Sequence, residues 1–180
     1  MDTRRLIRLS KLLSLILRHQ PQQFGIFLDP EGYADLREVL LAVQTQVPDA
    51  TEADLRHIVT TIETDKQRFS IVDGDIRANY GHSLADRIQH QPVAPPAILW
   101  HGTSEAALPG IATRGILPMK RQYVHLTTDE RLAMRVGSRH GVARTIRIDA
   151  ARAHAEGVLF YRANETFWLA AEIAPRYLDL

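Results

Sequence analysis

The residues best suited to chemistry in this sequence are basic, and Arg18-His19 is the first group of them. They end an apolar-faced helical pattern and precede Gln20-Pro21, where the chain must leave the helix. Arginine binds phosphate through planar, bidentate contacts, and histidine takes up or releases a proton near neutral pH. The alternative is structural, because cationic side chains at the C-terminal end of a helix complement its dipole. Taken alone, this segment favours the structural role.

A second group of polar residues lies on and after a predicted hairpin. Arg68 opens its first strand and Arg77 lies in the second. An exposed arginine on such a hairpin is usually a solvated charge. Residues 79–83, Asn-Tyr-Gly-His-Ser, follow directly. Their polar and flexible side chains fit either a loop that faces a phosphate or another ligand, or an ordinary turn.

The segment His101-Gly102-Thr103 ends an apolar run that predicts a strand. Glycine lets a ligand approach the backbone closely, and the histidine and threonine side chains offer hydrogen bonds. His125 alternates with Val124 and Leu126, which predicts that it lies on the opposite face from those aliphatic side chains. If both strands belong to one sheet, His101 and His125 can face a common cleft. The structural alternative is a histidine satisfied within the fold, which is the commoner role at a strand end.

Residues 137–141, Gly-Ser-Arg-His-Gly, follow a helical pattern. The first glycine is typical of a helix C-cap, while the arginine and histidine have the reach to contact a phosphate or an adenine. The sequence contains no HExxH or HxxEH pattern, no Walker or Rossmann glycine motif, and no cysteine. A nucleotide site in this chain must therefore have another architecture, and we expect no metal.

The elements that position these residues fall into two groups. Three helical patterns come first, at about residues 4–18, 35–44 and 51–63, followed by strands 68–72 and 75–80 around the hairpin signal Asp73-Gly74. Three helices and a hairpin are the element order of a winged helix-turn-helix, although fold alone does not establish a role. Residues 89–96 contain three prolines and predict a linker.

The pattern after this linker is different. Strand-like runs occur at residues 97–102, 122–127, 143–149, 157–162 and 166–173, and helical stretches lie near residues 104–113 and 129–136. This alternation predicts an α+β region built on a mainly antiparallel sheet.

Bulk properties limit the partners. The 180 residues carry a net charge of only +1, so any contact with nucleic acid must be local. The basic N-terminal segment has helical spacing of its apolar residues and lacks the unbroken apolar run of a leader. No apolar stretch approaches the roughly 20 residues that span a bilayer. We therefore expect a soluble, cytoplasmic protein without a membrane partner.

Taken together, these segments resemble the RNA 2′-phosphotransferase family, in the same order and over nearly the whole chain. The segments that carry the resemblance are LSKLLSLILRH, EGYADLREVL, RFSI, IRANYGHS, LWHGT, GILPMKRQYVHL, VGSRHG and FYRANETFWL. Each is weak alone, but eight in order are specific, and they outweigh the structural alternatives for the individual residues.

The resemblance implies an α+β fold with two lobes and the active site between them. Residues 1–90 would form a winged-helix lobe that binds RNA and phosphate, and residues 97–180 an ADP-ribosyltransferase-like, mainly antiparallel β lobe that binds NAD. The catalytic residues implied by position are Arg18, His19, Arg68 and Arg121. The implied NAD-binding residues are His101, Gly102, Thr103, His125, Ser138, Arg139 and His140.

Some positions depart from the family or its wider fold. The third signature position of the ADP-ribosyltransferase fold is a glutamate in many relatives, but it is apolar in this family and corresponds to Phe167 here. Tyr80 stands where the family usually has glutamine, and Glu165-Thr166-Phe167 stands where it has Asn-Gly-Val. We expect these departures to affect loop geometry or packing around the nicotinamide ribose and to leave the basic group intact.

The implied reaction removes an internal RNA 2′-phosphate, as in transfer-RNA splicing. The phosphate attacks the anomeric carbon of the nicotinamide ribose and nicotinamide leaves; the neighbouring ribose hydroxyl then attacks phosphorus. The products are RNA with a 2′-hydroxyl, nicotinamide and ADP-ribose 1″,2″-cyclic phosphate. We expect a monomer acting on transfer-RNA-like RNA. One alternative transfers ADP-ribose to a terminal phosphate of RNA or DNA and stops after the first step. Another is an inert winged-helix binding module, against which the four basic positions argue.

Overall fold

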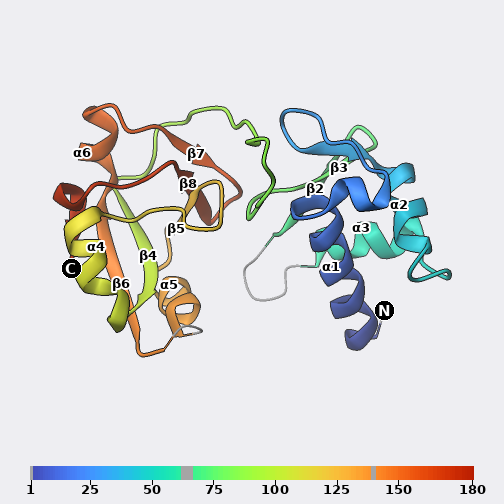
Figure 1. The fold of residues 1–180 in the computed structure, drawn as a ribbon, viewed down its shortest axis with the longest axis horizontal. Coiled ribbons are helices and arrows are strands. Elements are labelled where there is room, and N and C mark those ends of the chain that lie inside the picture. Colours follow the sequence, from blue (N-terminus) through green and yellow to red (C-terminus); the bar gives the residue numbers. More distant parts are fainter. Residues whose placement is uncertain (1, 62–66, 139–140) are drawn as a thin grey trace. The chain divides into compact units, whose positions relative to one another are not determined.

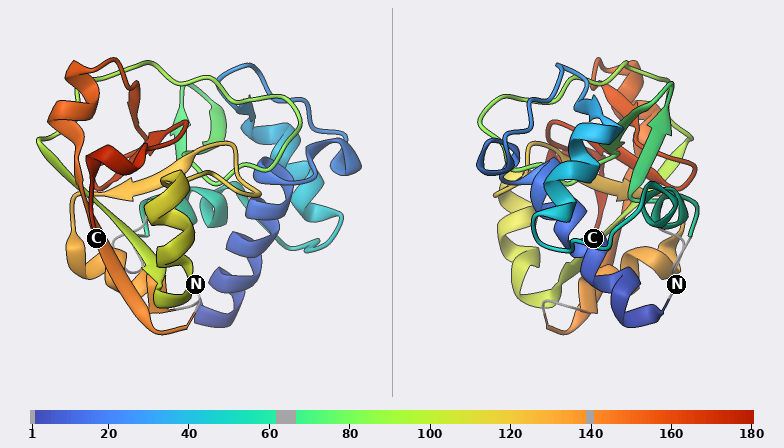
Figure 2. Two further views of the ribbon diagram at one scale, coloured as in Figure 1. Left: turned by 60° about the vertical axis from the view of Figure 1, so that its left-hand side comes forward. Right: turned by 90° about the vertical axis from the view of Figure 1, so that its right-hand side faces the viewer.

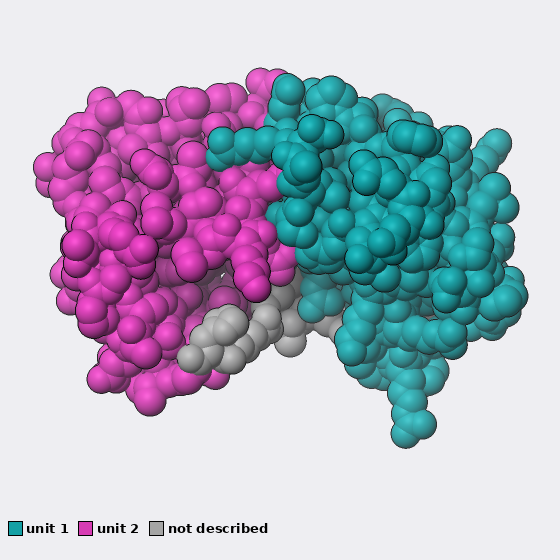
Figure 3. All heavy atoms as spheres, in the orientation of Figure 1, with its two compact units in different colours: residues 1–89 teal, residues 90–180 magenta. Residues whose placement is uncertain are grey.

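The computed structural model describes residues 2–61, 67–138 and 141–180. The chain divides into two compact units, residues 1–89 and 90–180, drawn in teal and magenta in Figure 3. Unit 1 combines helices with a three-stranded antiparallel sheet, and unit 2 combines helices with a six-stranded antiparallel sheet. The α+β class predicted from the sequence is confirmed.

Three α-helices build the core of unit 1. They are α1 (Thr3–Arg18), α2 (Leu36–Gln44) and α3 (Glu52–Thr60), and a 3-10 turn, η1 (Pro21–Phe24), follows the first. Helix α1 contacts both α2 and α3 (Figures 1 and 2) and turns its apolar side chains into their shared core. The side chain of Thr51 accepts a hydrogen bond from the backbone N–H of Asp54, whose carboxylate accepts one from the backbone N–H of Thr51. This capping box fixes the start of α3.

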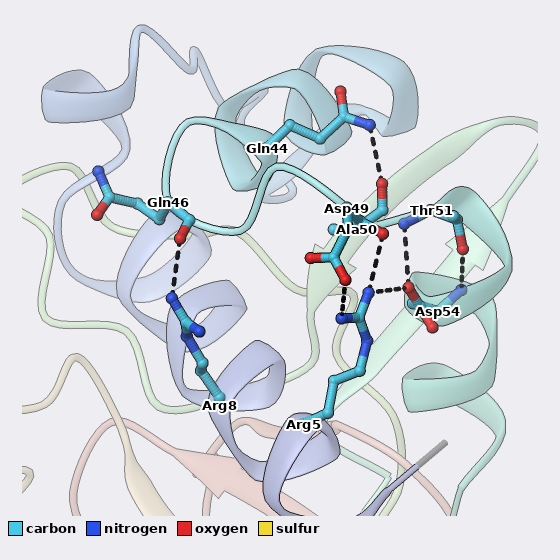
Figure 4. A network of polar contacts seen from close by, with 8 residues as sticks. All are labelled: Arg5, Arg8, Gln44, Gln46, Asp49, Ala50, Thr51 and Asp54. Carbon is cyan, nitrogen blue, oxygen red and sulfur yellow. Dashed lines mark hydrogen bonds and ion pairs between the residues drawn. The ribbon is translucent and has the colours of Figure 1, made fainter.

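Polar contacts tie the first half of α1 to the segment between α2 and α3 (Figure 4). The Arg5 guanidinium forms ion pairs with Asp49 and, at 2.9 Å, with Asp54. Arg8 donates to the backbone carbonyl of Gln46 at 2.9 Å. The hydrogen bond from Arg5 lowers the pKa of Asp54 below its ordinary value.

The sheet of unit 1 contains β1 (Tyr33–Asp35), β2 (Phe69–Val72) and β3 (Asp75–Ala78), in the order β1-β3-β2. The hairpin predicted at Asp73-Gly74 is confirmed. Both residues have positive φ angles, 52° and 93°, as a type I′ turn requires. Strand β1 was not predicted, because three residues are too short to show a period.

The sheet of unit 2 has six strands in the order β7-β8-β5-β4-β6-β9, and every neighbouring pair is antiparallel. The strands are β4 (Ile98–Ser104), β5 (Val124–Thr127), β6 (Ala143–Asp149), β7 (Phe160–Arg162), β8 (Phe167–Ala170) and β9 (Leu178–Asp179). The helices are α4 (Leu108–Arg114), α5 (Glu130–Gly137) and α6 (Ala150–Ala155), with 3-10 turns η3 (Glu105–Ala107) and η5 (Pro175–Tyr177). The mainly antiparallel sheet is confirmed, while the short elements α6 and β9 were not predicted.

Residues 89–96, interpreted as a linker from their prolines, are partly built into unit 2. The backbone N–H of Val93 donates to the carbonyl of Phe160 at 2.9 Å, and Pro92 forms an isolated bridge with Tyr161. The ring of His90 packs against those of Tyr123 and Tyr161, at centroid distances of 5.3 and 6.0 Å. Pro92 and Val93 therefore extend the edge of the sheet at β7.

No helix in the described part of the chain is both long enough and apolar enough to cross a lipid bilayer.

Candidate active site

Arg18 is the last residue of α1, and aromatic rings hold its guanidinium group. The carbon Cζ lies 5.2 Å from the ring centroid of Phe69 and 5.3 Å from that of Tyr80. Both distances are typical of cation–π contacts. The expectation that the departure at Tyr80 leaves the basic group untouched is therefore wrong, because its ring contacts Arg18. Its Nη2 also donates to the backbone carbonyl of Arg68 at 3.3 Å. A residue that sequence spacing favoured as a simple helix-end charge is therefore held by the start of the hairpin.

Arg68 lies directly before β2 and reaches back to α1. Its Nη1 donates to the hydroxyl of Ser10 at 3.2 Å, and Ser10 is buried. The backbone carbonyl of Arg68 accepts from the N–H of Asn79 as well as from Arg18. Arg68 is thus not the solvated hairpin arginine that its position alone suggested, because side-chain and backbone contacts fix it beside Arg18.

Residues 79–83 hold the end of α1. The backbone N–H of Ser83 donates to the carbonyl of Arg18 at 3.0 Å, and the Ser83 hydroxyl lies 2.8 Å from Nδ1 of His19. The side-chain oxygen of the buried Asn79 accepts a hydrogen bond from the Ser70 hydroxyl, and its amide N–H donates to the carbonyl of Gln67. Within unit 1, Arg18 therefore contacts Arg68 directly, and Ser83 holds both His19 and the end of α1.

Such a cluster is chemically suited to a phosphate. Two guanidinium groups supply forked N–H donors for phosphate oxygens, and the imidazole adds a donor or a proton carrier. The cluster forms because the chain returns to the end of α1 twice, at the start of the hairpin and again after it.

His101 lies in β4 of unit 2, next to β5. Its Nδ1 lies 2.9 Å from the backbone carbonyl oxygen of His125. Because a carbonyl only accepts, Nδ1 must carry the hydrogen, and Nε2 of the neutral ring is then an acceptor. Burial lowers the pKa of His101, an effect that the bond to the His125 carbonyl opposes. The net lowering favours the neutral ring.

Strands β4 and β5 belong to one sheet, which is the condition for His101 and His125 to face a common cleft. They pair only at Trp100 and Thr127, however, whereas β4 pairs with β6 along its whole length. The contact between the histidines runs from the His101 ring to the His125 main chain. The His125 side chain is half-buried between the buried Val124 and Leu126, which confirms the predicted alternation.

Gly102 serves the packing of the chain itself. A Cβ atom at Gly102 would lie 1.8 Å from the backbone oxygen of Ala133 in α5. Gly137, at the end of α5, is equally close to β4: a Cβ there would lie 2.5 Å from the oxygen of Thr103. The two glycines let α5 approach β4 backbone to backbone. The space expected for a ligand at the Cβ side of Gly102 is therefore filled by α5.

Thr103 is buried in β4, opposite Arg144 of β6. The other predicted residues of unit 2 lie in loops or in β8, which is an interior strand of the sheet. Arg121 closes a turn in which its N–H donates to the carbonyl of Pro118, and Ser138 caps α5 by donating to the carbonyl of Arg135. Phe167 is buried at the start of β8, opposite Thr127. Arg139 and His140 lie outside the described residues.

Comparison with known proteins decides the family. The family model described as RNA 2′-phosphotransferase, Tpt1/KptA family, matches residues 4–172. The chain belongs to this family.

Relatives in the RNA 2′-phosphotransferase family resemble this chain from end to end. Proteins named probable RNA 2′-phosphotransferase occur in Streptomyces griseus, with 39% identity over 100% of this chain and 99% of the relative, and in Thermococcus kodakarensis, with 39% identity over 96% of each. A third, from Hahella chejuensis, is 40% identical over 95% of this chain and 92% of its own length.

Three residues that hold the unit 1 cluster were missed as such in the sequence. Ser10 interrupts the apolar face of α1, and a buried polar residue at such a position is a detectable signal for a partner. Asn79 and Ser83 were seen only as parts of a polar segment.

Within the described residues, no group of three or more His, Asp or Glu side chains is arranged to hold a metal ion.

Proposed function

We propose that this protein removes an internal 2′-phosphate from RNA in an NAD-dependent reaction that releases nicotinamide and ADP-ribose 1″,2″-cyclic phosphate. The observation that carries the proposal is the hydrogen bond from the Arg18 guanidinium to the backbone carbonyl of Arg68, with His19 next to Arg18, in a chain of the RNA 2′-phosphotransferase family. Arg121 joins the proposed catalytic group on the family resemblance alone.

The cluster suits the phosphate of this reaction. A phosphate dianion is already nucleophilic and needs no general base, so what the protein must supply is positioning and charge. Arg18 and Arg68 supply both through bidentate contacts, and the rings of Phe69 and Tyr80 limit the motion of Arg18. The second step builds negative charge on oxygens bound to phosphorus, where a fixed donor is typically worth about 2.7–4 kcal/mol.

One described atom of unit 2, Nε2 of His101, is suited to bind NAD. In the neutral His101 ring, Nε2 accepts, so it suits a ribose hydroxyl or the nicotinamide amide N–H as donor. NAD supplies an anomeric carbon that becomes electrophilic as nicotinamide leaves. His101, Thr103, His125 and Ser138 are the described residues that we assign to NAD, together with the backbone of Gly102.

Element order supports the lobes inferred from the resemblance. Helices α1, α2 and α3 followed by the β2–β3 hairpin, with β1 added at its edge, are consistent with a winged helix in unit 1. The six-stranded antiparallel sheet of unit 2 is consistent with an ADP-ribosyltransferase-like lobe. A transfer-RNA-like substrate, a cytoplasmic location and a monomeric state stay predictions.

The test is product analysis with NAD and an oligonucleotide that bears one internal 2′-phosphate. We expect RNA with a 2′-hydroxyl and one nicotinamide per phosphate removed. Persistent ADP-ribosylated RNA would favour transfer of ADP-ribose to phosphate ends, and no NAD-dependent change at all would exclude both activities. Arg121→Ala should accumulate the ADP-ribosylated intermediate, while Arg114→Ala, an exposed arginine in α4, should leave turnover unchanged.

A further inference from the structure

Helix α1 carries an unusual concentration of positive charge. Five of the 22 basic residues of the chain lie in its 16 residues, and none of the acidic ones does. Residues 19–89, the rest of unit 1, contain six basic and twelve acidic residues. The excess positive charge of unit 1 is therefore confined to one helix.

Four of these residues form one face, which we call the basic stripe: Arg4, Arg8, Lys11 and Arg18. At about 100° per residue they fall within an arc of about 80°. The core-facing side chains of Leu9 and Leu13 point to the opposite side of the helix. Arg4, Arg8 and Lys11 are accordingly exposed to solvent, while Arg18, at the end of the stripe, is half-buried.

The charges of Arg4, Arg8 and Lys11 in the stripe are available to a partner. Arg8 donates to the uncharged carbonyl of Gln46, and within the described part of the chain Arg4 and Lys11 form no ion pair. The fifth basic residue, Arg5, lies off the stripe and is the one that pairs with Asp49 and Asp54 (Figure 4). Arg5 therefore stabilises the fold of unit 1, whereas Arg4, Arg8 and Lys11 face solvent.

We propose that the basic stripe binds the sugar–phosphate backbone of the substrate RNA beside the phosphate held at Arg18, an inference that rests on the proposed function. Arg4 and Arg18 are about 21 Å apart along the axis at 1.5 Å per residue. That length spans at most about six phosphates at the 3.4 Å spacing of one duplex strand, and fewer in an extended strand. The contacts are to phosphates, so the stripe binds without regard to base sequence.

A lipid surface fits this helix less well than RNA. A basic helix that lies on a membrane inserts its apolar face between the lipids. The apolar face of α1, including Leu6, Leu9, Leu13 and Leu17, is instead buried in the core of unit 1. Within α1, Ile7 is the one large apolar side chain that is exposed, at 43%, and a single such side chain does not form an apolar face.

The test measures RNA binding apart from catalysis. The probe is a fluorescent single-stranded RNA of about twelve nucleotides without a 2′-phosphate, titrated at about 50 to 200 mM KCl. The stripe variant is Arg4→Gln/Lys11→Gln, and the matched control is Arg37→Gln/Arg114→Gln, two exposed arginines on α2 and α4. Thermal unfolding of each variant confirms that it folds.

Each lost phosphate contact should lower the slope of log affinity against log salt by about 0.7 for a single strand. The magnitude of the slope should therefore be smaller by about 1.4 in the stripe variant, which lacks two contacts. Between about 50 and 200 mM KCl, the fold-loss of affinity should then be about sevenfold smaller in the variant than in the wild type. The control should keep the wild-type slope. Equal slopes in all three proteins, or binding of the stripe to anionic phosphatidylserine vesicles but not to RNA, would overturn the inference. Failure of the proposed function is separate, because it appears as absence of NAD-dependent turnover by the wild type.

Discussion

Gly102→Ala is the substitution for which the structure predicts the largest effect from a single methyl group. The new Cβ would lie 1.8 Å from the backbone oxygen of Ala133, whereas ordinary contact begins at 3.4 Å. Helix α5 or strand β4 must therefore move by about 1.6 Å. Neither moves easily, because β4 is paired with β6 along its whole length and α5 packs on both strands. Overpacking typically costs about 1–3 kcal/mol, and we expect the upper end here because the clash is with main-chain atoms.

Tryptophan fluorescence during urea unfolding is a direct assay, since both tryptophans, Trp100 and Trp168, belong to unit 2. With a denaturant dependence of about 2 kcal/mol per molar urea, a loss of about 3 kcal/mol lowers the midpoint by about 1.5 M. The matched control is Gly110→Ala in α4, where the new methyl meets only the flexible end of Arg114 at 3.3 Å. Alanine in place of that helical glycine should leave the midpoint unchanged or raise it.

The outcome separates two roles for Gly102. If the glycine serves only to admit NAD, Gly102→Ala raises the KM for NAD and leaves the urea midpoint alone. A midpoint equal to that of Gly110→Ala would refute a packing role for Gly102 against α5.

Three further predictions concern other parts of the molecule. Tyr80→Gln removes a ring contact to Arg18 worth about 0.5–2 kcal/mol, so kcat/KM for RNA should fall several-fold. Tyr80→Phe keeps the ring and should keep the wild-type value. Equal losses in both variants would contradict a ring contact. The KM for NAD should be flat above about pH 6.5 and should rise as pH falls through the lowered pKa of His101, because protonation removes the Nε2 acceptor; a KM that is constant down to acid pH would argue against this role. Because Arg5 lowers the pKa of Asp54, the stability from this pair is present above the ordinary carboxylate pKa and is lost as pH falls through the lowered one. The thermal midpoint should therefore fall less between about pH 5 and about pH 2 in Arg5→Gln than in the wild type, with Arg5→Lys between them.

Local pattern was enough to predict the regular elements with strong periods. The apolar spacing of α1, including Leu9 and Leu13, survives as its buried face. The Asp73-Gly74 hairpin follows from two residues that accept positive φ. Collinear motifs were likewise enough to indicate the family. Short elements such as β1 and α6 escaped prediction, because three to six residues show no clear period and are stabilised by their neighbours.

Long-range contacts decided what the individual functional residues do. Arg18 and Arg68 are 50 positions apart, and no spacing rule predicts that one bonds the carbonyl of the other. The sequence offered Gly102 as an approach for a ligand, and only the packing of α5 showed that the chain fills that space itself. The hydrogen on His101 Nδ1 is likewise assigned by a carbonyl 24 residues away. The sequence thus determined which residue types are present and which face of each element they occupy, while the tertiary structure determined their neighbours, because contacts between distant segments depend on how the whole chain packs.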